Sequence, residues 1–192
     1  YGYGKSGYAT WNYLKKENKI LIYDDNKKIN KFFVSYKEIL LTEFDYIVLS
    51  PGIDINRCKL KNYLKKNRKK IITDLDIFYI NNPNNLKITI TGTNGKSTTA
   101  KLLFNILRDQ NKDVIIAGNI GIPMLSIRNI KRSTIFVIEA SSYQIDYSQY
   151  FKTNYALILN ISPDHLERHK TIQKYTHAKF KLVLNQSKNF YA

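Results

Sequence analysis

Residues 88–107 read ITITGTNGKSTTAKLLFNIL, and this stretch decides the fold. It opens with an apolar run typical of a strand, passes through a glycine-containing turn and continues with helix-forming residues. In a strand–turn–helix of this kind, backbone amides and the helix N-terminus point toward an anion. The stretch therefore predicts a parallel α/β domain with an ATP or GTP phosphate loop.

The individual residues of this loop suit phosphate binding. Gly92 and Gly95 allow the backbone to turn its amides toward a phosphate, Lys96 can reach the β- and γ-phosphates, and Ser97 can hold Mg²⁺. The spacing departs from G-x-x-x-x-G-K-[ST], because Ile90 stands at the first glycine position. The predicted nucleotide-binding set is Gly92, Thr93, Asn94, Gly95, Lys96, Ser97 and Thr98.

Outward from the loop, short apolar runs alternate with helix-length amphipathic stretches, a pattern that favours parallel strands with crossover helices. Strands are expected at 20–23, 46–49, 70–72, 87–91, 114–117, 135–138 and 155–160, and helices at 6–17, 60–67, 98–111 and 172–183. The aperiodic, Pro- and Asn-rich stretch Asn81 to Leu86 is the predicted boundary between domains at 1–84 and 85–192.

Both domains are expected to be incomplete. The glycine turn at Gly2 to Gly7 needs a strand before it, and only Tyr1 precedes it, while Lys188 to Tyr191 resembles the start of a further strand. We therefore expect a fragment that lacks the first strand of one domain and the end of the other.

Composition limits the classes of function. The 192 residues carry a formal charge of +16, but the 31 basic residues include only six Arg and are spread evenly along the chain. Groove readers favour Arg, so we expect no nucleic-acid partner. No apolar run reaches the ~20 residues of a membrane span, and the single Cys58 excludes an internal disulfide. These features favour a cytoplasmic protein with no membrane partner.

A second glycine motif opens the chain. Gly2, Gly4 and Gly7 match G-x-G-x-x-G, and Asp24 or Asp25 ends the next strand, which indicates a phosphate-bearing nucleotide at the first helix. Taken alone the motif fits a dinucleotide equally well. SPGI at 50–53 follows another strand and is either part of the same site or an ordinary Pro-Gly turn.

Three downstream segments add candidate ligands. Glu139 follows the apolar run IFVI, at the position where a second acidic ligand of a nucleotide-bound Mg²⁺ is usual. His165 lies in NISPDHLERH (160–169), close to the same expected sheet edge. Lys179 lies in a basic amphipathic helix, where a solvated lysine is the ordinary interpretation.

Together TGTNGKST (91–98), GNIGIP (118–123), EASSYQ (139–144) and NISPDHLERH resemble the Mur ligase family in order and spacing. The resemblance implies a Rossmann-like UDP-binding domain followed by a P-loop ATPase-like parallel-sheet domain, with the family's third domain absent. It also implies ATP-dependent amide-bond formation in peptidoglycan precursor synthesis, through an acyl phosphate.

The resemblance also implies roles for single residues. The UDP compound would contact Lys5, Ser6, Asp24, Asp25, Asn26, Ser50, Pro51 and Gly52, and its sugar or peptide end would contact Asn119, Ser141 and Gln144. The catalytic set would be Lys96, Glu139, His165 and Lys179. Ser97 and Glu139 would hold one Mg²⁺, while His165 and a carbamylated Lys179 would hold a second, with Lys181 the main competitor of Lys179.

The implied substrates are ATP, UDP-N-acetylmuramoyl-L-alanine and D-glutamate, handled by a monomer. The fragment alone is expected to lack ligase turnover. A family member that adds another amino acid, a folate-polyglutamating enzyme, a P-loop kinase or NTPase, and a regulatory nucleotide-binding module are the alternatives.

Overall fold

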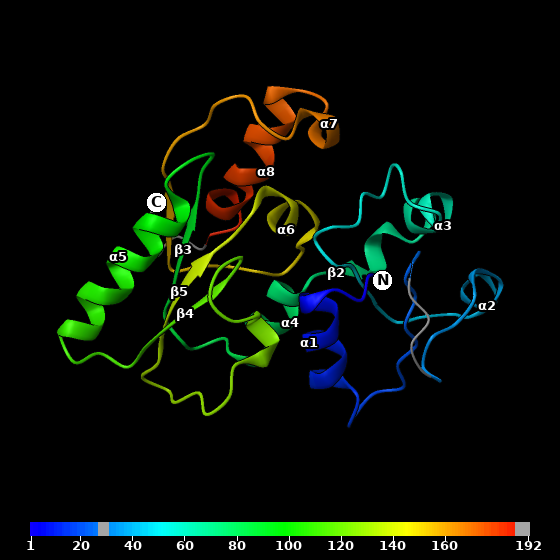
Figure 1. The fold of residues 1–192 in the computed structure, drawn as a ribbon, viewed down its shortest axis with the longest axis horizontal. Coiled ribbons are helices and arrows are strands. Elements are labelled where there is room, and N and C mark those ends of the chain that lie inside the picture. The colour runs from blue at the N-terminus through cyan, green and yellow to red at the C-terminus, as the bar shows by residue number, and fades with distance from the viewer. Residues whose placement is uncertain (27–30, 187–192) are drawn as a thin grey trace.

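The computed structural model describes residues 1–26 and 31–186 and confirms an α/β chain with parallel sheets (Figure 1). The strands are β1 (Ile47–Val48), β2 (Ile71–Ile72), β3 (Lys87–Thr91), β4 (Val114–Gly118), β5 (Ile135–Glu139) and β6 (Tyr155–Ile158). The α-helices are α1 (Lys5–Leu14), α2 (Tyr36–Leu41), α3 (Lys61–Lys66), α4 (Asp74–Asn81), α5 (Lys96–Asp109), α6 (Ser142–Tyr147), α7 (Leu166–His169) and α8 (Ile172–Leu184). Two short 3-10 helices are η1 (Arg68–Lys70) and η2 (Met124–Ser126).

The larger sheet has the strand order β4-β5-β3-β6, and all its pairs are parallel. Successive side chains of β5 point to opposite faces of the sheet, as is usual for a strand. Val137 packs with Ile90 and Ala100 on the side of α5, while Phe136 and Ile138 join the main core on the opposite side. The central strand β5 is therefore buried on both faces, which explains its continuous apolar run IFVI.

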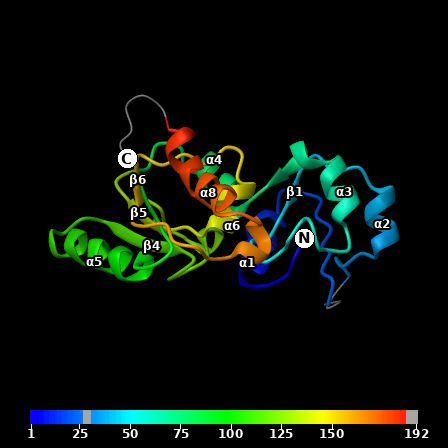
Figure 2. The same cartoon turned by 90° about the horizontal axis from the view of Figure 1, so that it is seen from above.

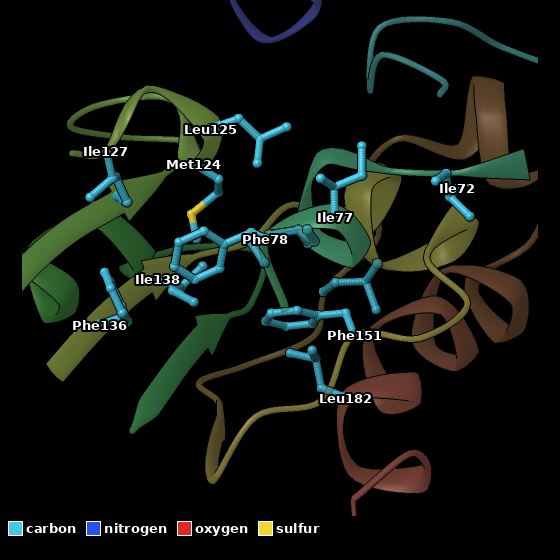
Figure 3. Close-up of a cluster of buried hydrophobic side chains, with 14 of the residues drawn as sticks. Ile72, Ile77, Phe78, Met124, Leu125, Ile127, Phe136, Ile138, Phe151 and Leu182 are labelled. Atoms are coloured by element: carbon cyan, nitrogen blue, oxygen red, sulfur yellow. The ribbon is translucent and has the colours of Figure 1, made fainter. Parts of the chain in front are cut away.

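The main core lies between this sheet, α4, η2 and α8 (Figure 3). Phe78 of α4 meets Phe136 edge to face, with ring centroids 4.8 Å apart. Ala9 of α1 and Ile72 of β2 belong to the same cluster, so α1, β2 and α4 share a core with the rest of the chain. Other buried apolar residues among the first 84 form a second cluster, namely Tyr23, Ile39, Leu49, Ile55, Leu60, Leu64 and Ile71.

The smaller sheet consists only of β1 and β2, which pair in parallel through Ile47–Ile71 and Val48–Ile72. The strand expected at 20–23 is reduced to a single bridge between Ile22 and Phe33. Figure 2 shows α2 and α3 of this part at one end of the molecule, and α5 at the other. The expected strand at 188–191 lies outside the described residues.

The stretch between the two sheets is ordered by one buried amine. Lys87, at the start of β3, is 1% exposed, and its Nζ donates to the carbonyls of Asn82 and Asn85, the latter at 2.8 Å. The division at residues 84 and 85 stays a prediction, since α4 precedes it and yet packs on the larger sheet.

Four helices of the sequence-based assignment are found within two or three residues of their expected ends, namely α1, α3, α5 and α8. The helices α2, α4, α6 and α7 were not expected. Three of them begin with a capping box, Ser35–Glu38, Thr73–Asp76 and Ser141–Gln144, in which each side chain bonds the other residue's backbone amide. Among the described residues, no helix combines the length and apolarity needed to cross a membrane.

Candidate functional site

The carboxyl ends of the four parallel strands bring polar groups to one edge of the larger sheet. Asn119 follows β4, Glu139 ends β5, the loop from Gly92 to Lys96 follows β3, and Asn160 follows β6. In parallel α/β sheets this edge is where ligands bind. Segments separated by up to 68 positions in the chain, from 92 to 160, thus form one candidate site.

The loop after β3 has the backbone conformation of a phosphate cradle. Gly92 and Gly95 have φ of 154° and 81°, and a Cβ on Gly92 would lie 3.1 Å from the Leu159 Cβ. Helix α5 begins immediately after Gly95, and its first amides have no acceptor inside the helix. The loop therefore presents a helix N-terminus that favours an anion.

Asn160 holds the loop in place. Its Oδ1 accepts the amides of Thr93 at 3.2 Å and Asn94 at 2.9 Å, and its Nδ2 donates to the Asn94 carbonyl at 3.1 Å. These two loop amides are already used by Asn160. The amides at the start of α5, from Lys96 onward, have no acceptor inside the helix and are therefore the ones available to a phosphate.

Lys96 lies over the loop itself. Its Nζ donates to the carbonyl oxygens of Gly92 at 2.9 Å and Thr93 at 2.7 Å. The ammonium group thus sits at the mouth of the loop, where it adds a full positive charge to the partial charge of the helix end.

Ser97 and Glu139 face each other beside the loop. Ser97 Oγ donates to Glu139 Oε2 at 2.6 Å, and Asn119 Nδ2 donates to Glu139 Oε1 at 2.9 Å. The Glu139 side chain is 1% exposed. A hydroxyl and a carboxylate are the oxygen ligands that Mg²⁺ prefers, so this pair fits a magnesium ion.

Across residues 1–26 and 31–186, no group of three or more His, Cys, Asp or Glu side chains is arranged to hold a metal ion. A magnesium ion at Ser97 and Glu139 would take its other ligands from nucleotide phosphates and water, as is usual for this ion.

Lys179 and Lys181 point to different places. Lys179 is 1% exposed, and its Nζ donates to the Gly92 carbonyl at 2.8 Å, directly at the phosphate loop. Burial, assisted by the charge of Lys96, lowers the pKa of Lys179 to about 8. Lys181 donates to the Asp146 and Ser148 carbonyls at the end of α6, away from the loop.

Tyr175 lies between the remaining candidates. Lys179 Nζ is 4.6 Å from the centre of its ring, the ring of His165 is 6.2 Å away, and its hydroxyl is 3.1 Å from Thr93 Oγ1. His165 itself has φ of 53° and precedes α7, with Asp164 3.5 Å from its Nε2. His165 and Lys179 therefore both lie near the Tyr175 ring, beside the phosphate loop.

The glycine turn at the start of the chain is closely packed. A Cβ on Gly7 would lie 1.9 Å from the Gly2 carbonyl oxygen, and a Cβ on Gly2 would lie 2.8 Å from Ser50 Cβ. Ser50 Oγ donates to the Gly2 carbonyl at 2.7 Å, so the SPGI turn touches the glycine turn. Asp24 accepts the Tyr3 amide at 2.7 Å, which brings the end of the 20–23 segment to the same place.

The predicted substrate contacts therefore fall into two groups. The first group lies around the glycine turn and consists of Asp24, Ser50 and the first residues of α1, Lys5 and Ser6. The remaining members of this group are their neighbours in the chain, namely Asp25, Asn26, Pro51 and Gly52. Asn119 and Ser141 belong to the larger sheet's edge, Asn119 through Glu139 and Ser141 as the N-cap of α6. Gln144 is buried, and its Oε1 accepts the Ser141 amide and hydroxyl, so its observed role is to cap α6.

The Mur ligase middle domain family matches residues 90–192, which is more than half of the chain. The chain belongs to the Mur ligase family. The resemblance inferred from the four motifs is thereby confirmed.

Several curated relatives of this Mur ligase chain share one name. UDP-N-acetylmuramoylalanine–D-glutamate ligase of Rickettsia bellii is 36% identical over 200 residues, which cover 100% of this chain and 44% of the relative. The protein of the same name from Caldicellulosiruptor bescii is 36% identical over 96% of this chain and 44% of its own length. The chain spans less than half the length of these relatives.

A solved structure shares the fold of this Mur ligase chain. The UDP-N-acetylmuramate:L-alanyl-gamma-D-glutamyl-meso-diaminopimelate ligase from Neisseria meningitides aligns with a TM-score of 0.52 at 15% identity, over 80% of this chain and 52% of that one.

Sequence reasoning missed two residues that shape the site of this Mur ligase chain. Asn160 could have been found from its position directly after a strand, where the other candidates also lie. Arg168 could not, because its partners are backbone carbonyls more than a hundred positions earlier, which carry no side-chain signature.

Proposed function

We propose that this chain is the UDP-substrate-binding and ATP-phosphate-binding part of a ligase that joins D-glutamate to UDP-N-acetylmuramoyl-L-alanine. The observation that carries the proposal is the meeting of Lys96, Ser97, Glu139 and Lys179 around one phosphate loop. The relatives' sequences match 96–100% of this chain, and their shared name supports the choice of substrates.

Residues 1–84 would bind the UDP compound, and residues 85–192 would bind ATP. A third domain, outside this chain, would complete the site for the incoming amino acid. We place the protein in the cytoplasm, because its proposed substrates are water-soluble anions and Cys58, the single cysteine of these 192 residues, suits a reducing compartment. We also propose that it acts as a monomer.

In the proposed reaction, an oxygen of the alanyl carboxylate attacks the γ-phosphorus of ATP. The new P–O bond gives an acyl phosphate, and ADP departs with the electrons of the broken bond. The amino group of D-glutamate then attacks the acyl carbon, loses a proton and expels inorganic phosphate, which leaves the amide.

The residues of this chain would hold the reacting anions together. Lys96 and the start of α5 would bind the transferring phosphoryl group, while Gly92 and Gly95 keep the loop open to it. Ser97 and Glu139 would hold one Mg²⁺, and His165 and Lys179 a second. These cations neutralise the repulsion between ATP and the carboxylate when they are bound.

Lys179 would serve the second ion as a carbamate. The burial that lowers the pKa of Lys179 to about 8 increases the share of free amine able to add CO₂. The contact of Nζ with the Gly92 carbonyl favours Lys179 over Lys181 for this role. Nuclear magnetic resonance with isotope-labelled bicarbonate should show a carbamate signal that disappears in Lys179→Arg and persists in Lys181→Arg.

Calorimetric titration tests the proposed function. The chain should bind UDP-N-acetylmuramoyl-L-alanine and Mg·ATP, and should not bind NAD. Lys96→Ala should abolish Mg·ATP binding and leave the UDP compound bound. Binding of NAD without the UDP compound would refute the proposal, whereas binding of Mg·ATP alone would favour a P-loop kinase or NTPase.

A further inference from the structure

Arg168 connects the two halves of the candidate site. It lies in α7, and its Nη1 donates to the Pro51 carbonyl at 2.6 Å while its Nη2 donates to the Ile53 carbonyl at 2.8 Å. Both acceptors belong to the SPGI turn, 117 and 115 positions earlier in the chain. One side chain from the ATP-binding part thus holds a turn of the UDP-binding part at two points.

The guanidinium group is itself held in place. Its carbon lies 4.0 Å from the ring centre of Tyr143 and 5.1 Å from that of Tyr147, both on α6. Tyr147 also contacts the UDP-binding part (residues 1–84) directly, because its hydroxyl accepts the Ile55 amide at 3.3 Å. The planar fork of arginine suits this arrangement, since it can stack on rings and donate to two carbonyls at once.

On the side of the UDP compound, the SPGI turn is tied to the glycine turn. Ser50 Oγ donates to the Gly2 carbonyl at 2.7 Å, and the Ile53 amide closes the turn onto the Ser50 carbonyl at 3.0 Å. A displacement of the Pro51 and Ile53 carbonyls would therefore move the glycine turn as well.

On the side of the nucleotide, the same helical turn carries His165 and His169. His169 is buried, and its Nε2 lies 3.0 Å from Ser142 Oγ, three residues after Glu139 in the chain. His165, three residues before Arg168, lies against Tyr175 beside the loop. The position of α7 thus depends on contacts with both halves.

We propose that Arg168 is a positioning residue that couples the two ligand sites, so that binding of the UDP compound strengthens binding of Mg·nucleotide and the reverse. The inference rests on the proposed function. Because coupling between two binding equilibria is reciprocal, each ligand must change the affinity of the other by the same factor.

Calorimetry on the whole chain measures this factor. The affinity for UDP-N-acetylmuramoyl-L-alanine is determined with and without a saturating non-hydrolysable Mg·ATP analogue, and the converse titration is done in parallel. We expect a coupling factor of about five or more in the wild type. It should fall to about one in Arg168→Met, with the affinity for the analogue alone changed by less than about twofold.

Two further variants distinguish a loss of the Arg168 contacts from a general effect of removing a positive charge or of unfolding. Arg108→Met removes an exposed charge at the far end of α5 and should keep the wild-type factor. Arg168→Lys keeps the charge and loses the two-pronged contact, so its factor should also be close to one. Because lysine preserves the charge near Tyr143, this variant serves if Arg168→Met does not fold.

The outcomes distinguish this inference from the proposed function. If both ligands bind and the wild type shows no coupling, or if both Arg168 variants keep it, the coupling role is wrong and the proposed function stands. If the UDP compound does not bind the wild type, the proposed function fails, and the coupling role fails with it.

Discussion

The Ser97 hydroxyl donates to Glu139 Oε2 across 2.6 Å, which joins the first turn of α5 to the end of β5. The two residues are 42 positions apart in the chain. They meet because β3 and β5 are parallel neighbours in register, with Ile90 opposite Glu139. Parallel pairing therefore places the hydroxyl that follows β3 beside the carboxylate that ends β5.

Glu139→Gln should weaken nucleotide binding only when Mg²⁺ is present. The amide keeps the shape of the side chain and removes the charged metal ligand, so affinity for Mg·ATP should fall about 10–100-fold. Affinity for ATP measured in a chelator should change by less than about threefold. Glu17→Gln, on a carboxylate just beyond α1, is the matched control and should change neither affinity. An equal loss with and without Mg²⁺ would contradict the metal role.

Gly7→Ala should disrupt the first part of the chain, because its Cβ would lie 1.9 Å from the Gly2 carbonyl oxygen. We expect a loss of about 3 kcal/mol or more in the free energy of unfolding, together with loss of UDP-compound binding. Gly4→Ala provides the control for stability, since nothing lies within 4 Å of a Cβ at that position. Urea denaturation should show the two variants far apart, and similar denaturation midpoints would refute the close packing of the glycine turn.

Asp76→Ala should be among the most destabilising single substitutions. The buried carboxylate accepts the Ser148 hydroxyl at 2.7 Å and the amides of residues 149–151 at 2.7–2.9 Å. Removing it leaves four donors without this acceptor, of which the Ser148 hydroxyl and the Phe151 amide are buried, at a cost of about 3–5 kcal/mol in the free energy of unfolding. Asp109→Ala, on an exposed carboxylate at the end of α5, should cost less than about 0.5 kcal/mol. Comparable denaturation midpoints for the two variants would exclude this anchoring role.

Lys87 should make stability depend on alkaline pH. Burial lowers the pKa of Lys87 from 10.5 to about 8, so between these values the unfolded chain binds more protons than the folded one. Stability therefore rises with pH in this window, by up to about 1.4 kcal/mol per pH unit from this group. Lys179 and Lys181 have lowered pKa values as well, so the wild-type slope has several contributors.

The variant Lys87→Met shows how much Lys87 contributes to the pH dependence of the free energy of unfolding. Its free energy of unfolding, measured by urea denaturation from pH 8 to 10, should rise less steeply than that of the wild type. Lys69→Met removes an exposed amine and should keep the wild-type slope. A wild-type slope in Lys87→Met would show that its amine is not desolvated in the folded chain.

The sequence predicted the larger sheet well and the helices between its motifs poorly. Strands β4 to β6 consist almost wholly of apolar residues, which gives a clear signal, whereas α4 is buried from Asp74 to Phe78 and shows no helical period. Its start is nevertheless marked by the capping box Thr73–Asp76, as Ser35–Glu38 marks α2 and Ser141–Gln144 marks α6. The capping-box pattern, which does not depend on helical periodicity, predicts the start of each of these three helices.

The candidate site was predictable where its residues follow strands and unpredictable where tertiary contacts decide. Glu139 and the phosphate loop were found from local context alone. The resemblance favoured Lys179 over Lys181, and the direction of α8 relative to the loop, which no local pattern contains, brings the Lys179 amine to the Gly92 carbonyl. Arg168 needed the path of a distant turn, since backbone carbonyls accept from any donor that reaches them.

The central claim is that the UDP compound and ATP meet at the edge formed by the strand ends. A crystal structure with UDP-N-acetylmuramoyl-L-alanine, Mg²⁺ and a non-hydrolysable ATP analogue measures the decisive distance, from the alanyl carboxylate oxygen to the γ-phosphorus. We predict a separation of about 3–4 Å, with the γ-phosphate beside Lys96 and Glu139. A UDP compound bound away from the glycine turn, or a separation beyond about 8 Å, would contradict the account.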